Sequence, residues 1–227
     1  MFIPTLIFKL ALSCALGFFS LALWHSSPAS WICGEGSPVD SQRPFVFQNK
    51  AETAALFSCV FFLAFLPRSS GECILLCPVL TALLQLSLSD IFYRILQDEW
   101  EIFIALLGVL RVLSDSKTAQ TFVPALSRRL AAALLFILLW LLCAVIAGAL
   151  KSDIPLGFGD AKLLAACCIL LGAGKTLRSA ALAFILAGIY AGLLLTFKKT
   201  RKKDRIAFGP FICLGILYSL ESWGRFC

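Results

Sequence analysis

Long apolar stretches follow one another along almost the whole chain, and they constrain its fold more than any other feature. The clearest, from Leu130 to Leu150, has no charged residue, and about 20 apolar residues suffice to cross a bilayer as a helix. The others are Leu6 to Trp24, Ala54 to Leu66, Cys73 to Leu88, Ile102 to Leu113, Ala161 to Gly174, Ala180 to Phe197 and Ile206 to Leu220. With 60% hydrophobic residues and a mean hydropathy of +0.91, the composition excludes an ordinary soluble domain. We expect an all-α, polytopic membrane helical bundle of about eight transmembrane helices in a lipid bilayer.

The net charge of +7 indicates topology rather than nucleic-acid binding, because the cations lie in short segments between apolar stretches. The densest cluster, Lys198 to Arg205, is predicted to face the cytoplasm. If the chain has eight spans, successive connecting segments alternate between the two sides of the membrane. Counting back from this cluster then places Asp90 and Asp160 near the cytoplasmic face. The segment from Arg111 to Arg129 is also positively charged, but this orientation would place it outside the cytoplasm. It therefore does not agree with the predicted orientation.

The ten cysteines do not predict a metal site. Most lie within apolar stretches, where a thiol behaves as a small hydrophobic group. Cys73 and Cys77 share a helical face, but no histidine or second cysteine pair accompanies them. The single His25 is interpreted as an interfacial polar residue. We therefore expect no bound metal.

One carboxylate stands at the start of an apolar stretch, where it is costly. Asp160 follows Gly157 and Gly159, and a charged side chain at membrane depth costs about 3 kcal/mol on insertion scales. Such residues usually face a polar cavity or a partner and mark function. The best candidate partner is Asp90, which closes another apolar stretch. Two acids at two segment ends suggest an aspartyl pair, and Asp153 is a weaker alternative to Asp160.

The glycines before Asp160 are expected to shape its surroundings. Gly157 and Gly159 would let the backbone take strained or positive-φ angles and approach a peptide closely. Further along, Gly188 and Gly192 stand four residues apart in an apolar stretch, a spacing that permits close helix packing.

Three segments carry a family resemblance. Asp160 completes a GxGD motif followed by Lys162, and Asp90 begins a D-x6-P-like motif in which Gln97 replaces proline and Asp98 follows. The stretch from Ile206 to Phe211, with Gly209 and Pro210, is close to PFGPF. In this order the three motifs resemble those of prepilin peptidases, the membrane aspartic proteases of type IV pilus and type II secretion systems.

The resemblance implies an activity and a site. It implies that Asp90 and Asp160 are catalytic, with Gly157, Gly159, Lys162, Arg94, Gly209 and Pro210 as supporting motif residues. It also implies cleavage of the short basic leader of prepilins or pseudopilins at the cytoplasmic face of a bacterial inner membrane. No cofactor is expected for peptide cleavage.

The first part of the chain is reduced relative to that family. We expect residues 1–89 to form N-terminal membrane helices with a short cytoplasmic loop, and residues 90–227 to form the peptidase core. Only Cys33 occurs where many members carry two C-x-x-C pairs for zinc, so the zinc insertion is absent. Methylation of the new N-terminus with S-adenosylmethionine is therefore in doubt. The first apolar stretch resembles a cleavable signal peptide, but we favour an uncleaved span.

The segment from Asp90 to Glu101 is strongly acidic. It contains Asp98, Glu99 and Glu101 beside the single base Arg94, and it is predicted to form a negative loop that attracts a basic leader. Glu99 and Glu101 fit equally well as solvated loop residues. Asp98 has a further interpretation, as a cap of the helix that follows.

Other functions remain open at this point. A related GxGD protease acting on preflagellins or signal peptides would use the same chemistry. A transporter or ion-conducting bundle would use Asp90 and Asp160 to bind a cation or relay protons. An inactive scaffold of a secretion machine would explain Gln97. The ordered motifs favour the peptidase.

Overall fold

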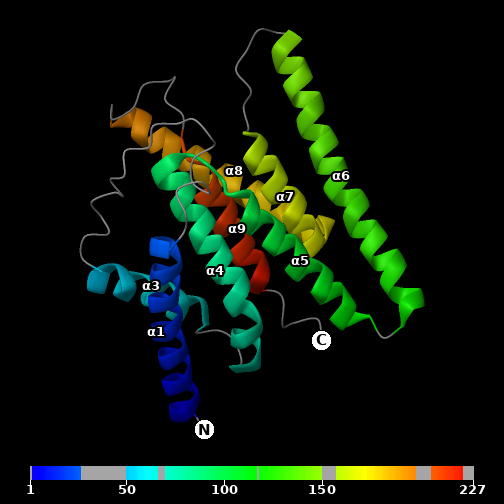
Figure 1. Cartoon of the computed structure of the whole chain (residues 1–227). Coiled ribbons are helices and arrows are strands. Elements are labelled where there is room, and N and C mark those ends of the chain that lie inside the picture. Colours follow the sequence, from blue (N-terminus) through cyan, green and yellow to red (C-terminus); the bar gives the residue numbers. More distant parts are fainter. Residues whose placement is uncertain are drawn as a thin grey trace. The chain divides into compact units, whose positions relative to one another are not determined.

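The computed structural model describes residues 2–26, 50–65, 70–116, 118–149, 157–197 and 206–221. Every regular element in these ranges is a helix (Figure 1). The helices are α1 (Phe2–Ser26), α3 (Lys50–Phe65), α4 (Ser70–Tyr93), α5 (Asp98–Asp115), α6 (Ala119–Ala149), α7 (Phe158–Leu171), α8 (Ala173–Thr196) and α9 (Gly209–Glu221). Each predicted apolar stretch lies largely within one of them, so the all-α prediction is confirmed.

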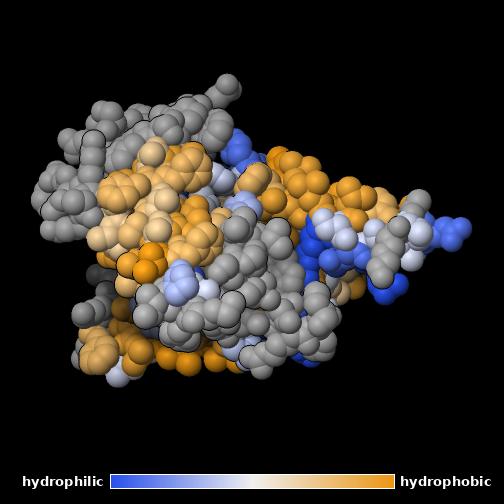
Figure 2. All heavy atoms as spheres, turned by 90° about the horizontal axis from the view of Figure 1, so that it is seen from below, coloured by the Kyte–Doolittle hydropathy of each residue, from blue (hydrophilic) through white to orange (hydrophobic). Residues whose placement is uncertain are grey.

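Four of these helices are long and apolar enough to cross a membrane. They contain the spans Pro4–Trp24, Leu76–Tyr93, Gln120–Ala149 and Ala173–Thr196. Most side chains of α6 and α8 are exposed, and Figure 2 shows broad hydrophobic areas on the molecular surface. Exposed apolar helix surface of this extent suits hydrocarbon as its surroundings. The chain is thus a multi-pass helical membrane protein, although α3, α7 and α9 are shorter than a full span.

The chain divides into two compact units, Met1–Ile95 with Glu221–Cys227, and Leu96–Leu220. The predicted boundary between residues 1–89 and 90–227 concerns function and stays a prediction.

In the first unit, α1 packs against α3 and α4. Gly17 of α1 lies directly against Ser58 and the Ala54 carbonyl of α3, where a larger side chain would collide. Gln85 of α4 donates a hydrogen bond to the carbonyl oxygen of Ser20 at 2.7 Å. At the end of α1, the buried Trp24 packs on aromatic side chains near the end of α4. These contacts hold the part of α4 that carries Asp90.

In the second unit, α7 is the central element. From Leu163 to Leu171 its side chains are all apolar and all but one are buried, as expected for a helix enclosed by others. Helices α5, α6 and α8 pack against it. Gly108 of α5 makes the closest approach, because a Cβ atom there would lie 2.6 Å from the backbone nitrogen of Leu170.

The last helix is fixed to α8 by polar and close backbone contacts. Ser179 of α8 donates to the hydroxyl of Ser219 of α9 at 2.7 Å. Gly215 of α9 lies against the backbone of Ser179, leaving no room for a Cβ atom. These contacts hold α9 directly against α8.

The described glycines differ in their structural roles. The apolar stretch Ala161 to Gly174 is not one element, because Gly172, at φ 85°, ends α7 and separates it from α8. Gly188 and Gly192 do not pack against another helix in the described chain, since no atom lies within 4 Å of a Cβ built at either position. Close packing occurs instead at Gly17, Gly108 and Gly215.

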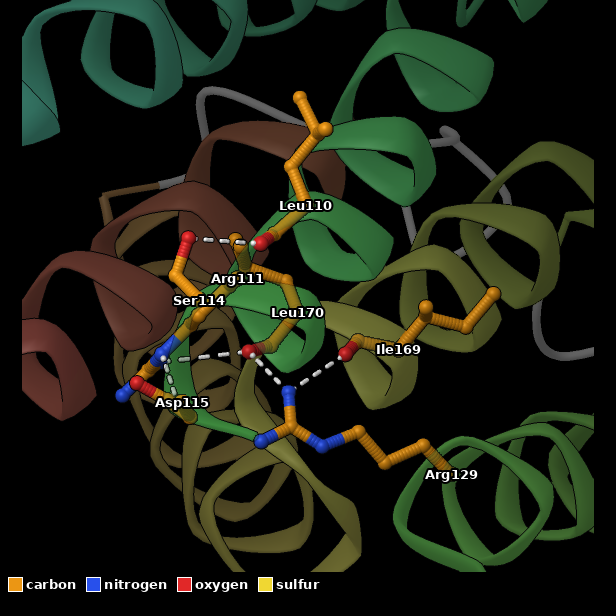
Figure 3. A network of polar contacts seen from close by, with 7 residues as sticks. All are labelled: Leu110, Arg111, Ser114, Asp115, Arg129, Ile169 and Leu170. Atoms are coloured by element: carbon orange, nitrogen blue, oxygen red, sulfur yellow. Dashed lines mark hydrogen bonds and ion pairs between the residues drawn. The ribbon is translucent and has the colours of Figure 1, made fainter. Parts of the chain in front are cut away.

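Two arginines bind the C-terminal end of α7 (Figure 3). Arg129 Nη1 of α6 donates to the carbonyl oxygens of Ile169 at 2.8 Å and Leu170 at 3.0 Å. Arg111 Nη1 of α5 donates to the same Leu170 oxygen at 3.3 Å. The last carbonyls of a helix have no partner within it and carry partial negative charge, so these cations stabilise that end. They also fix α7 relative to α5 and α6.

Candidate active site

Asp160 lies in the first turn of α7, directly over the residue that precedes the helix. Gly157 is the N-cap, with φ −63° and ψ 151°. A Cβ atom at this position would lie 3.2 Å from Oδ2 of Asp160, so glycine leaves space for the carboxylate. The free N–H groups and the dipole at a helix N-terminus favour a negative charge there.

Gly157 and Gly159 matter because they lack a Cβ atom, and positive φ is not what the structure shows at this motif. This corrects the expectation of strained or positive-φ angles. Gly157 has negative φ, and among the described glycines only Gly172 has positive φ. At Gly159 a Cβ atom would lie 3.2 Å from the side chain of Leu96, a tight contact that glycine avoids. The motif therefore lets the segment before α5 approach the start of α7.

Lys162 joins α7 to the first turn of α5. Its Nζ atom binds the carboxylate of Asp98 and lies 3.8 Å from Oε2 of Glu101. Asp98 and Glu101 are three residues apart and share one helix face. Nζ also lies 5.2 Å from the centre of the Phe158 ring, a cation–π contact.

Glu101 is the most perturbed acid of this group. Its side chain is 5% exposed, and burial raises the pKa of its carboxyl from 4.5 to about 8. Lys162 lowers this pKa, whereas the charges of Asp98 and Asp160 raise it. The proton-bound form of Glu101 therefore predominates at neutral pH, and its charge state is coupled to that of Asp160.

Several buried polar atoms near Glu101 have no hydrogen-bond partner among the described residues. They are both amide atoms of Gln97, Nε1 of Trp100 and Oε1 of Glu101. Gln97 is 2% exposed and is the N-cap of α5, where its side chain caps nothing. Since buried unsatisfied polar atoms are rare and costly, this turn has unused capacity for hydrogen bonds.

Asp90 lies in the other compact unit, in the last turn of α4. It is 7% exposed, and its carbonyl oxygen accepts a hydrogen bond from the backbone nitrogen of Arg94 at 2.9 Å. Arg94 is exposed and ends the helix in the left-handed conformation, at φ 55°. This is the geometry of a helix C-terminus that usually takes glycine. Arg94 is thus bound to Asp90 through the backbone.

The third motif begins α9. Gly209 and Pro210 are its first residues, a position where proline's missing N–H costs nothing. The aromatic residues around them pack on α8, with ring centres 4.9 Å apart for Phe184 and Phe208 and 5.5 Å apart for Tyr190 and Phe211. These contacts pack the start of α9 against α8.

The acidic segment differs from the predicted loop. Helix α4 continues to Tyr93 and α5 begins at Asp98, so Asp90 and the other acids are helical. Glu99 is exposed, but Glu101 is buried, which excludes the solvated interpretation for Glu101. Asp98 does not cap α5, because it is already helical and its carboxylate binds Lys162.

The predicted residues fall into three groups. Asp160, Gly157, Gly159 and Lys162 gather at the start of α7; Asp90 and Arg94 lie at the end of α4; Gly209 and Pro210 start α9. Sequence reasoning named Glu101 only as one acid of the predicted negative loop, although its position directly before an apolar stretch was a usable signal. Asp153, Cys33 and Lys198 to Arg205 lie outside the described residues, as do the side chains of His25 and Cys73. The expected absence of a metal therefore stays a prediction.

Comparison with known proteins gives one match. The model of the type IV leader peptidase family matches residues 77–192, just over half of the chain. The matched range includes both Asp90 and Asp160, together with the whole of α5. No curated protein and no solved structure matches the chain.

Proposed function

Because the chain belongs to the type IV leader peptidase family, and is therefore related to peptidases, we propose that it is a membrane aspartic endopeptidase. Its catalytic groups would be the carboxyls of Asp90 and Asp160. The observation that carries this proposal is the family match, which extends across both acids and across the first two of the three motifs. It favours peptide cleavage over the transporter and scaffold hypotheses.

The chemistry requires two carboxyls in different protonation states. One ionised carboxylate takes a proton from water, and the protonated partner polarises the scissile carbonyl. Two like charges close together do not both ionise easily, so such a pair shares a proton and titrates as a unit. The helix N-terminus at Asp160 favours its ionised form, and the buried Glu101 beside it adds a group whose charge affects that balance.

The substrate we propose is a prepilin or pseudopilin. The acids around Lys162 outnumber it, which suits a leader that carries basic residues. We propose cleavage at the cytoplasmic face of a bacterial inner membrane; the cationic segment Lys198 to Arg205 supports this face, because such segments favour the cytoplasmic side. Whether a methyl group is then added from S-adenosylmethionine is a separate question, because the N-terminal region is reduced.

The test is co-expression with a prepilin, followed by intact-mass analysis of the pilin. The wild type should release the leader, whereas Asp160→Asn and Asp90→Asn should leave the prepilin uncut at equal membrane levels. The same spectrum shows whether one methyl group has been added. Leader removal by either variant would exclude that residue from the catalytic pair.

A further inference from the structure

Lys162 joins the helix that carries Asp160 to two acids of α5. It lies two residues after Asp160, in the first turns of α7. Its Nζ atom binds the carboxylate of Asp98 and lies 3.8 Å from Oε2 of Glu101. One positive charge therefore faces two acids on α5 and stands close in sequence to a third acid on α7. The charge balance at this place depends on which of the three acids are ionised.

Glu101 differs from the other acids at the start of α5 because it is buried. Its side chain is 5% exposed, whereas Asp98 and Glu99 are exposed. Charges in a buried position are screened much less by water and salt than charges at the surface. The Oε1 atom of Glu101 has no hydrogen-bond partner among the described residues. An ionised Glu101 therefore depends on Lys162 for compensation, and its charge acts strongly on its neighbours.

The groups that share an electrostatic interaction with Glu101 come from two helices. Asp98 lies on α5 itself, and Asp160 and Lys162 lie on α7. The fourth group is the buried thiol of Cys167 on α7, and a thiol in apolar surroundings stays protonated. The charge of Asp160 raises the pKa of Glu101, so the two carboxyls are close enough to interact. Such coupling is reciprocal, and a negative charge on Glu101 favours the protonated form of Asp160.

We propose that Glu101 is a positioning residue of the aspartyl pair, which acts through its charge on Asp160 and helps the pair to keep its shared proton as pH rises. This inference rests on the proposed peptidase function. While Glu101 is protonated it adds no charge to the site. Once Glu101 ionises, its negative charge opposes the loss of the shared proton, so the singly protonated pair persists to higher pH.

The first test needs no peptidase activity. The ¹³C NMR spectrum of the full chain, labelled at the glutamate carboxyls, follows the titration of Glu101, whose resonance is assigned by its loss in Glu101→Gln. Asp160→Asn should lower the pKa of Glu101 by at least about 0.5 unit, because it removes a nearby negative charge. Lys162→Gln should raise this pKa. The control Asp115→Asn, at the other end of α5, should leave it unchanged. An equal pKa of Glu101 in the wild type and in Asp160→Asn would overturn the proposal.

The second test is the dependence of kcat/KM on pH for peptide cleavage. Glu101→Gln keeps the shape of the side chain and removes its charge, so the alkaline limb should move to lower pH by at least about 0.5 unit. The acid limb should stay in place, because Glu101 of the wild type is already protonated there. A purely structural role would lower the rate at all pH values and move neither limb.

The control for the pH profile is again Asp115→Asn, which should move neither limb. An unchanged alkaline limb in Glu101→Gln, or an equal shift in the control, would overturn the proposal. A folded Glu101→Gln variant without activity would overturn it as well, because a residue that only adjusts the charge of Asp160 is not essential for turnover.

These outcomes separate the role of Glu101 from the proposed function. If the wild type does not cleave, or if Asp160→Asn cleaves, the peptidase proposal fails and the role of Glu101 falls with it, while the NMR titration still shows whether the two carboxyls are coupled. If cleavage requires both Asp90 and Asp160 but Glu101→Gln has the wild-type pH profile, the peptidase proposal stands and the role of Glu101 alone is contradicted.

Discussion

Oε2 of the buried Glu101 lies 3.8 Å from Nζ of Lys162, across the packed first turns of α5 and α7. This pair places a carboxyl with a pKa of about 8 within the electrostatic reach of Asp160. The start of α7 is therefore a coupled group of acids around one lysine. That coupling has consequences for stability and for pH dependence.

The first prediction concerns stability against pH. In the folded chain the pKa of Glu101 is raised from 4.5 to about 8, so the unfolded chain loses this proton first as pH rises. The contribution of Glu101 to stability is therefore full below about pH 4.5 and is lost progressively up to about pH 8. Glu101→Gln should flatten the fall in stability across this range. Thermal unfolding in detergent at several pH values measures the change.

The matched control is Glu99→Gln, which removes an exposed carboxylate two residues away. It keeps the buried carboxyl of Glu101, to which the pH dependence is assigned, so it should keep the wild-type slope between pH 5 and 8. A Glu101→Gln variant with the same slope as the wild type would contradict the assignment of a raised pKa to Glu101.

The second prediction concerns Gln97, where the family pattern has proline. Its φ of −79° is within the range of proline, and among the described residues its backbone nitrogen donates no backbone hydrogen bond. Substitution also removes two buried amide atoms without partners. Gln97→Pro should therefore stabilise the protein by about 1 kcal/mol and preserve activity. The control is Gln97→Ala, which also removes the carboxamide; unfolding midpoints below that of the wild type in both variants would contradict the prediction and show that the carboxamide has a structural role.

The third prediction concerns the close approach of α5 and α7. A Cβ atom at Gly108 would lie 2.6 Å from the nitrogen of Leu170, a backbone atom that cannot move without shifting the helix. Gly108→Ala should cost about 1–3 kcal/mol. The control is Gly188→Ala. A Cβ atom at Gly188 would have no neighbouring group within 4 Å, so this substitution in a helix should be neutral or stabilising by about 0.5–1 kcal/mol. Unfolding midpoints of the two variants in the same detergent test this order, and equal effects would contradict it.

Hydrophobic pattern was sufficient to predict the helices and the membrane class. The uncharged stretch from Leu130 predicted α6, although the helix extends upstream to Ala119 with Pro124 inside it. Orientation is harder to derive. The cations of Arg111 and Arg129 contradicted the positive-inside count, and both bind the end of α7, so their positions are also set by packing.

The candidate site could be predicted only in part from the sequence. The GxGD motif correctly marked the start of a buried helix, and Lys162 was identified as a neighbour of the acid. The partnership of Lys162 with Asp98 and Glu101 joins segments some sixty residues apart, and no local spacing predicts it. The burial of Glu101 likewise depends on how α5 packs against α7. The catalytic roles of Asp90 and Asp160 stay predictions.

The central claim is that these two aspartates together perform peptide cleavage. Its most direct test is the rate at which the purified protein, in lipid, cuts a synthetic peptide containing a basic leader and the first residues of a pilin. The wild type should release the leader, and Asp90→Asn and Asp160→Asn should each lower the rate by at least about a thousandfold, as expected when one member of a catalytic pair is lost. A rate within a few-fold of the wild type for either variant would contradict the claim.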